Sequence, residues 1–223
     1  MTSKVAAVAA LTLTLLPRLV FAQGVETDRV AEAARVLEEV LAAPDKGVPQ
    51  AIIEKAQAVA VIPSTVKGAL IIGAQRGKGV MSVKTATGWS APAFITLTGG
   101  SIGLQIGGQA TDIVLVVVND RGIDNLSQNT FKIGGDASVA AGPVGREAAA
   151  STDYKLQAEI LSYSRSRGLF AGVSLAGSTI RADRNANEKI YGVGYSTRNI
   201  VVERKVEPTA AAAAWLKVLK EKM

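Results

Sequence analysis

Residues 58–83 read AVAVIPSTVKGALIIGAQRGKGVMSV. The stretch contains short apolar, β-branched runs, such as Val59–Ile62 and Ala69–Ala74, that are separated by glycine or proline. Punctuated runs of this kind are typical of β-strands joined by tight turns. Similar runs follow in Ala93–Leu97, Ile113–Val118, Tyr154–Tyr163 and Leu169–Leu175. We therefore expect an antiparallel sheet formed mainly between residues 59 and 180.

Glycine is concentrated in the same part of the chain. Of the 22 glycines, 15 lie between Gly68 and Gly145, where they alternate with Ile, Leu and Val. A flexible linker does not fit this pattern, because so many large apolar side chains need burial. Glycine within a strand marks a bulge, a bend or a close approach of two backbones. The sequence therefore predicts a Gly-rich, strongly curved antiparallel sheet or a barrel-like core.

Upstream of this stretch the apolar residues follow a helical period. Residues 26–43 carry apolar side chains at steps of three and four, and Pro44 ends the pattern. A second helix is expected to begin at Pro49, because proline suits the first helical position. This helix would place Ile52 and Ile53 on one side.

Helices are also expected near the end of the chain. A short helical piece is predicted near Asn185–Tyr191, and a last helix follows Pro208. Thr209 is a candidate cap for that last helix, in which Trp215 and Leu219 share a face. The predicted fold class is therefore α+β, with the curved sheet flanked by N-terminal and C-terminal helices.

The first 22 residues have the layout of a secretory signal peptide. Lys4 provides a positive start, Val5–Leu16 is an apolar run, and Val20 and Ala22 stand at −3 and −1 of a cut before Gln23. The run is shorter than the roughly 20 residues of a membrane span, although an uncleaved anchor is the alternative. We expect residues 1–22 to be removed and residues 23–223 to form one domain. The expected location is the periplasm or cell envelope, peripheral to a membrane.

Composition excludes several functions. The full chain has a formal charge of +6, and loss of Lys4 and Arg18 with the signal peptide leaves +4. That excess suits an anionic surface. With so few aromatic residues, stacking platforms for nucleic acid are not expected.

Histidine and cysteine are both absent, which removes His-dependent triads, Cys–His pairs and imidazole-ligated zinc. We therefore expect no enzyme, no metal and no cofactor.

Two stretches resemble catalytic motifs. Ser64–Lys67 has the S-x-x-K spacing of penicillin-recognising enzymes, but the companion Ser-Asp-Asn and Lys-Thr-Gly motifs are missing. Gly73–Gly79 falls one residue short of a phosphate-binding P-loop and lacks its Ser or Thr. A glycine hairpin with exposed charges is the preferred interpretation of Gly73–Gly79. Neither stretch predicts catalysis.

Several segments together resemble the SYLF family, and they occur in that family's order. The matching segments are residues 56–63, 66–69, 77–80, 89–94, 105–107, 111–115 and 140–146, and the most specific is Tyr163–Leu175, YSRSRGLFAGVSL. The resemblance covers roughly residues 28–221. It implies a lipid-binding domain without catalysis, and in some eukaryotic members an actin-binding one. Actin is not an expected partner of an exported protein.

The resemblance implies lipid binding by basic residues, but the first helix here is acidic. We therefore place the candidate lipid-binding charges elsewhere, around the first glycine hairpin and after the later motifs. The candidates are Lys67, Arg76, Lys78, Lys84, Arg146, Arg165 and Arg167. They would hold anionic phospholipid headgroups by charge and, for arginine, by bidentate hydrogen bonds. The alternative for each is an ordinary surface charge or ion pair. The alternative function is a structural protein that docks another envelope protein.

Overall fold

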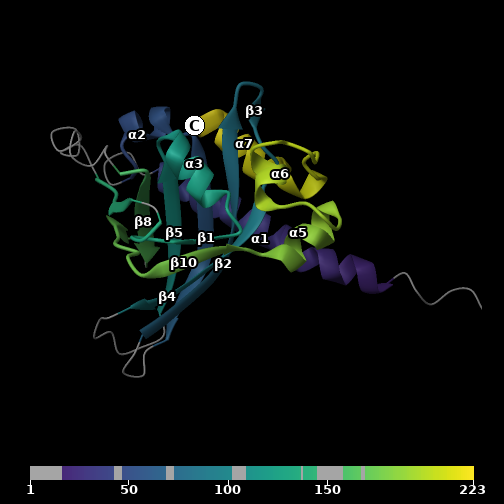
Figure 1. Ribbon diagram of the computed structural model, residues 1–223, viewed down its shortest axis with the longest axis horizontal. Coiled ribbons are helices and arrows are strands. Elements are labelled where there is room, and N and C mark those ends of the chain that lie inside the picture. Colours follow the sequence, from purple (N-terminus) through teal and green to yellow (C-terminus); the bar gives the residue numbers. More distant parts are fainter. Residues whose placement is uncertain are drawn as a thin grey trace, which may run out of the picture.

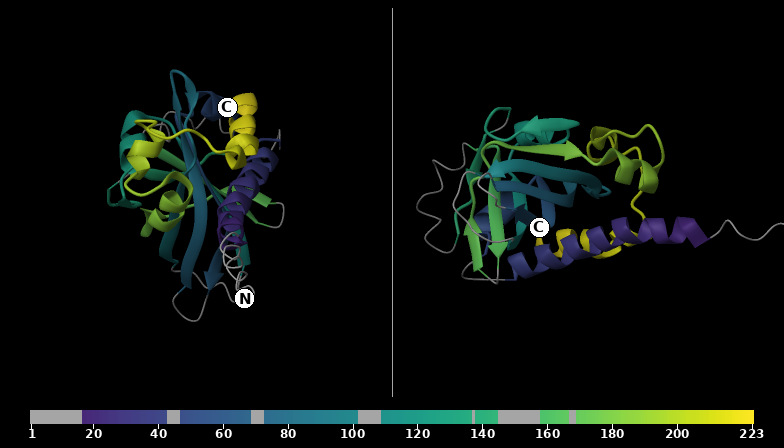
Figure 2. Two further views of the ribbon diagram at one scale, coloured as in Figure 1. Left: turned by 90° about the vertical axis from the view of Figure 1, so that its right-hand side faces the viewer. Right: turned by 90° about the horizontal axis from the view of Figure 1, so that it is seen from below.

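The protein is an α+β domain in which helices from both ends of the chain pack against one curled sheet (Figures 1 and 2). The computed structural model describes residues 17–42, 47–68, 73–101, 109–136, 138–144, 158–166 and 169–223. Its helices are α1 Pro17–Leu41, α2 Gln50–Lys55, α3 Asp120–Leu126, α5 Arg184–Tyr191, α6 Thr197–Val201 and α7 Ala213–Lys222. Its strands are β1 Ala58–Gly68, β2 Gly73–Thr85, β3 Gly88–Trp89, β4 Ala93–Ser101, β5 Gln109–Val117, β6 Thr130–Lys132, β7 Val139–Ala141, β8 Ile160–Ser166, β9 Leu169–Gly172 and β10 Ser178–Ala182.

The strands form a half-barrel with the order β6-β10-β4-β2-β1-β5-β8-β7, while β3 pairs with β2 and β9 with β8. The expected α+β class and curved sheet are confirmed. One detail is corrected, because β7 and β8 pair in parallel and the sheet is mixed rather than wholly antiparallel. A parallel pair needs a crossover of about a dozen residues or more, and the chain between Ala141 and Ile160 is long enough for one.

The central part of the sheet is buried on both sides, which explains why its central strands have continuous apolar runs. On one side, here called the α1 side, Val61 and Val80 contact a cluster that includes Leu37 of α1 and Trp215 of α7. On the opposite side, Ile62 and its neighbours pack in a second cluster with residues of β6, β10, α3 and α6. Strands covered on both faces read as unbroken apolar sequence rather than as strict alternation.

Strand β1 contains a bulge at Pro63 and Ser64. Ile62 pairs with Ile113 and Thr65 with Thr111, so two residues of β1 stand opposite the single residue Asp112 of β5. Proline donates no backbone hydrogen bond and is tolerated inside a sheet at such bulges. Ser64 has a positive φ of 47°, and its N–H donates to Asp112 Oδ1 at 2.9 Å. The S-x-x-K tetrad therefore lies in a bulged strand and does not open a helix.

The Gly-rich motifs near residues 142 and 172 pack against each other. A Cβ at Gly142 would lie 2.1 Å from the ring of Tyr163, and a Cβ at Gly172 would lie 2.1 Å from the carbonyl oxygen of Gly142. Tyr163 is buried, and its ring stacks on Phe170 with centroids 5.2 Å apart. Burial also raises the pKa of the Tyr163 hydroxyl. These glycines are required because two backbones and a ring meet with no room for a side chain.

The helix predictions are largely confirmed. Helix α1 begins at Pro17 and ends at Leu41, and α2 buries Ile52 and Ile53 but has Pro49 as its N-cap rather than its first helical residue. Helix α5 matches the expected helical piece. Thr209 precedes a 3-10 turn (Ala210–Ala212, η2), but its side chain makes no capping hydrogen bond, so that prediction is wrong.

The strand predictions are confirmed at β1, β4 and β5, with shorter strands near the C-terminal end. Strand β9 ends at Gly172 rather than at residue 175. Gly73–Gly79 lies inside β2, which pairs antiparallel with β1, and Arg76 and Lys78 are exposed, so the stretch forms one arm of a hairpin with exposed charges, as expected. Most of the expected run Ala69–Ala74 and residues 154–157 lie outside the described residues.

The N-terminal predictions stay predictions. Residues 1–16 lie outside the described part of the chain, and α1 includes residues 17–22. Cleavage before Gln23 would therefore shorten α1 at its N-terminal end. Within the described residues, no helix combines the length and hydropathy needed to cross a membrane.

Candidate functional site

The structure distributes the seven predicted lipid-binding residues over separate regions. Arg146 and Arg167 lie outside the described residues. Lys67 is described by its backbone alone, which pairs with Gln75 of β2 and Gln109 of β5. The other four are Arg76, Lys78 and Lys84 of β2 and Arg165 of β8.

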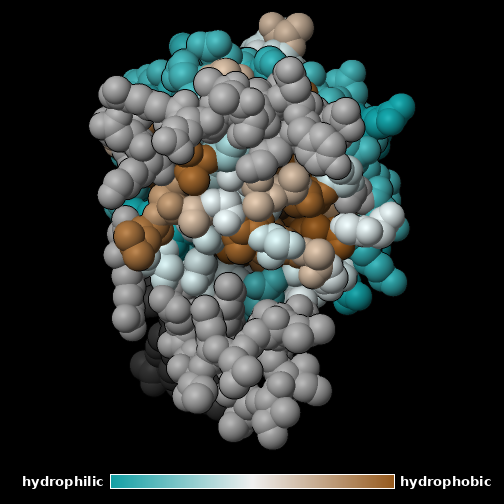
Figure 3. Space-filling model, turned by 90° about the vertical axis from the view of Figure 1, so that its left-hand side faces the viewer, coloured by the Kyte–Doolittle hydropathy of each residue, from teal (hydrophilic) through white to brown (hydrophobic). Residues whose placement is uncertain are grey.

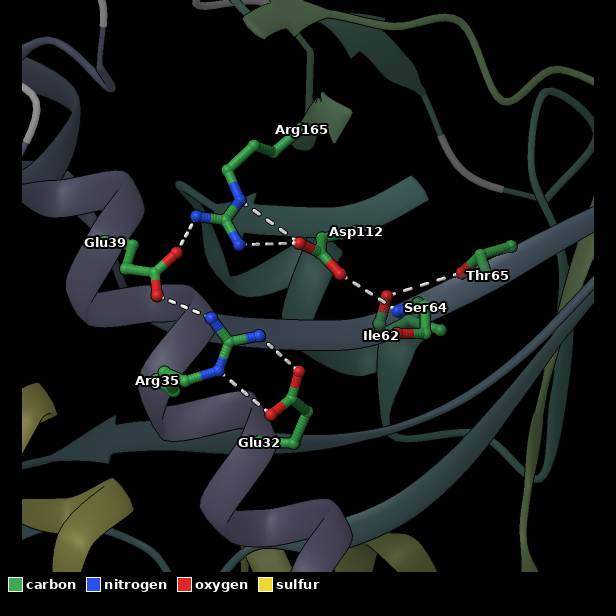
Figure 4. Close-up of polar contacts among 8 residues, drawn as sticks. All are labelled: Glu32, Arg35, Glu39, Ile62, Ser64, Thr65, Asp112 and Arg165. Carbon is green, nitrogen blue, oxygen red and sulfur yellow. Dashed lines mark hydrogen bonds and ion pairs between the residues drawn. The ribbon is translucent and has the colours of Figure 1, made fainter. Parts of the chain in front are cut away.

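Arg165 is part of a chain of ion pairs that joins the sheet to α1 (Figure 4). Its Nε and Nη2 donate to Asp112 Oδ2 at 3.1 and 3.0 Å, and its Nη1 contacts Glu39 of α1. The Arg165 side chain is 21% exposed and that of Asp112 is 13% exposed. Partial burial lowers the pKa of Arg165, as does the nearby charge of Arg35. The charge of Arg165 is therefore already balanced by two carboxylates.

The ion-pair chain continues along the surface of α1. Arg35 contacts Glu39 at 2.5 Å and donates from Nε to Glu32 at 3.0 Å. The hydrogen bond from Arg35 lowers the pKa of Glu32, and the same bond raises the pKa of Arg35. At the other end of the ion-pair chain, Asp112 accepts a hydrogen bond from the backbone N–H of Ser64 in the bulge of β1. The chain thus ties the bulge to the first helix (Figure 4).

Replacing Arg165 with glutamine should lower stability rather than membrane affinity. The change leaves Asp112 partly buried without its cation, and breaking such a pair costs about 1–3 kcal/mol at partial burial. Urea unfolding should register this loss. The matched variant Arg76→Gln should unfold like the parent, because Arg76 is exposed and forms no ion pair with the described residues. An unchanged unfolding midpoint for Arg165→Gln would contradict the role of the ion-pair chain.

Lys84 lies at the other end of β2 from Arg76. Its Nζ donates to the backbone oxygen of Met223 at 2.6 Å and lies 5.8 Å from the centroid of the Trp89 ring. These contacts hold Lys84 beside α7. Six residues of strand β2, about 20 Å, separate Lys84 from Lys78.

Arg76 and Lys78 do lie together, on the exposed part of the α1 side. Pairing across four strands aligns Lys78–Thr96–Arg181–Thr130 in one row and Arg76–Thr98–Thr179–Lys132 in the next. We call these eight residues the basic face. The four Lys and Arg side chains of the basic face are exposed, and none of its eight residues is Asp or Glu. The structure therefore adds Arg181 and Lys132 to the two predicted residues.

Sequence reasoning missed Arg181 and Lys132 because neither lies in a Gly-rich motif. The signal that could have revealed Arg181 and Lys132 was the alternation of polar and apolar residues along the chain. Thr179-Ile180-Arg181, Thr130-Phe131-Lys132 and Thr96-Leu97-Thr98 each place an apolar residue between two polar ones. That period indicates a strand with one buried and one solvated face. Only the strand order shows that the solvated faces are contiguous.

The residues of the candidate site do not form a recognisable catalytic arrangement. Within the described residues, no group of three or more carboxylates is arranged to hold a metal ion. The two stretches that resembled catalytic motifs, Ser64–Lys67 and Gly73–Gly79, are parts of strands β1 and β2. What the site offers is a set of cations and hydroxyl groups at an open surface.

Comparison with known proteins identifies the family. Residues 98–222 match the family described as "Ysc84: Las17-binding protein actin regulator", which is more than half of the chain. The chain belongs to the Ysc84 family. This confirms the SYLF resemblance, because the Ysc84 and SYLF names denote the same domain family. The family description names binding and regulation, and it names no reaction.

Relatives within the Ysc84 family include yeast and human proteins. Protein YSC84 of Saccharomyces cerevisiae is 34% identical over 83% of this chain and 41% of its own length. LAS seventeen-binding protein 3 of the same species is 34% identical over 80% of this chain and 39% of its own length. SH3 domain-containing YSC84-like protein 1 of Homo sapiens is 33% identical over 74% of this chain and 49% of its own length. The match therefore spans half or less of these relatives.

Proposed function

We propose that the mature chain is an exported, non-enzymatic binding module that attaches to anionic phospholipid headgroups at a membrane of the cell envelope. The observation that carries the proposal is the pair of exposed cations Arg76 and Lys78 on an open sheet face. The charge of +4 after loss of the signal peptide supports it, since anionic surfaces attract basic segments. The signal-peptide pattern of residues 1–22 supports export.

Binding should depend on headgroup charge and on salt. Each Lys or Arg near an anionic surface contributes about 1 kcal/mol, and the attraction falls off within a Debye length. That length shrinks from about 10 Å at about 0.1 M salt to about 3 Å at about 1 M. Co-sedimentation with phosphatidylglycerol-containing vesicles should weaken about tenfold or more over this range, whereas phosphatidylcholine vesicles should bind weakly throughout. Equal affinity for both vesicle types, unaffected by salt, would overturn the proposal.

A second candidate function is docking of another envelope protein. The side of the molecule that carries β8 and β9 exposes apolar residues (Figure 3). Leu169 of β9 is 73% exposed and Val144 is 37% exposed, which is unusual for large apolar side chains. The family description also names a protein partner. Salt-insensitive binding to an envelope protein that is lost on Leu169→Ser would favour this function.

A further inference from the structure

The basic face has a regular geometry that goes beyond a general excess of positive charge. Adjacent strands lie about 4.8 Å apart, and alternate residues along one strand are about 6.7 Å apart. Lys78 and Arg181 are two strands apart in the same row, with Thr96 between them. Their backbones are therefore about 10 Å apart, and both long side chains can reach a phosphate that lies over Thr96.

The opposite side of these strands holds the basic face in place. Gly77, Leu97, Ile180 and Phe131 alternate with the polar residues on the same four strands, and all four are buried. Gly77 has no room for a side chain, since a Cβ there would lie 2.4 Å from Thr65 Oγ1. The spacing of the cations is thus set by hydrogen-bonded strands whose other side is packed core.

The acidic residues near the basic face do not neutralise its positive charge. Asp183 lies at its edge, where its Oδ2 is 2.9 Å from Arg29 Nη1 and 3.8 Å from Lys78 Nζ. Because Arg29 and Asp183 are both largely buried and paired, Asp183 compensates Lys78 only in part. Asp136 accepts the backbone N–H of Lys132. Arg76, Arg181 and Lys132 form no ion pairs with other residues of the described chain.

We propose that the whole basic face lies against the anionic phospholipid surface, so that Arg181 and Lys132 contribute as much as Arg76 and Lys78. This inference rests on the proposed function and specifies where the lipid is held. Four cations spread over four strands can contact neighbouring headgroups of a planar array at once. A small soluble anion would reach only a pair of them. The basic face also presents no aromatic side chain on which nucleic-acid bases could stack.

The decisive test compares two double variants of equal charge. Arg181→Gln with Lys132→Gln removes half of the cations from the basic face. Arg121→Gln with Lys217→Gln removes the same charge from exposed positions on α3 and α7. Affinity for phosphatidylglycerol vesicles should fall about tenfold or more in the first variant, or about 1.4 kcal/mol per tenfold. It should fall less than about threefold in the control, because distant charges are screened. Urea unfolding confirms that both variants are folded.

The outcomes separate the inference from the proposed function. If the parent protein fails to bind anionic vesicles, the proposed function is wrong. If the parent binds but both double variants weaken equally, net charge alone drives attachment and the basic face is not the site. If inorganic polyphosphate in solution binds with the same dependence on Arg181 and Lys132 while vesicles do not bind, the face serves a soluble polyanion instead.

A fluorophore attached to the basic face would report direct contact between this face and the vesicle surface. The chain contains no cysteine, so a single substitution gives one labelling position. Thr130→Cys, carrying an environment-sensitive fluorophore, should shift its emission to shorter wavelength when anionic vesicles are added. The same label at Ala214→Cys, which is exposed on α7, should not shift. The reverse result would place α7 rather than the basic face against the membrane.

Discussion

Replacement of Trp215 by alanine is expected to lower the free energy of unfolding by about 4 kcal/mol. The side chain is fully buried where α7 packs on α1 and the sheet, and its Nε1 donates to Ser82 Oγ at 2.9 Å. The change therefore opens a large cavity and also leaves the buried Ser82 hydroxyl without its donor. Because a typical domain is stable by only about 5–15 kcal/mol, the loss should be obvious in urea unfolding.

Two companion variants separate the causes of this loss. Trp215→Phe keeps most of the apolar volume but removes the indole donor, so it should cost much less than the alanine variant. Leu216→Ala changes the neighbouring, partly exposed position on α7 and should cost less than about 2 kcal/mol. If Trp215→Ala and Leu216→Ala were equally mild, α7 would not be part of the core.

Replacement of Gly79 by alanine should destabilise the protein by about 3 kcal/mol or more. A Cβ on Gly79 would lie 2.2 Å from the carbonyl oxygen of Val61 and 2.8 Å from the Cα of Ile62. Both atoms belong to the backbone of β1, so neither can rotate away. The new methyl group would force β1 and β2 apart just beside the bulge. A lowered urea midpoint measured by circular dichroism would show the effect.

Gly135→Ala is the matched control for Gly79. Its added Cβ would meet only Lys132, at 3.7 Å from the Cβ and 4.0 Å from the carbonyl oxygen, and both are ordinary contacts. The expected change in stability is within about 0.5 kcal/mol, as for most open surface positions. Similar losses at both glycines would mean that the effect reflects glycine itself and not the close approach of β1 to β2.

The fold class could be predicted from sequence because the strongest signals were local. The change of period at Ala58 and the glycines alternating with apolar residues both report on a few consecutive residues. The parallel pairing of β7 could not be predicted in this way. Val139–Ala141 is only three residues long, and its partner depends on how the chain returns to β8.

The candidate site was only partly predictable for the same physical reason. Arg76 and Lys78 belong to one strand, and their shared side follows from the two-residue period. The partners of Arg165 are 53 and 126 residues away in sequence, and charge alone does not reveal such pairs. The rows that add Arg181 and Lys132 depend on the order of strands β2, β4, β10 and β6, which no local pattern encodes.

Helix α1 also constrains the order in which the molecule can assemble. Its contacts to Arg165, Asp183 and Lys189 join residues separated by 126, 154 and 163 positions. Contacts between such distant residues carry a large loop-closure cost and slow the folding of a domain. These three contacts of the first helix can therefore form only after strand β8 and helix α5 are available. Its packing on the nearby strands β1 and β2 does not depend on them, so we expect α1 to cover the sheet first and to be fixed by its ion pairs last.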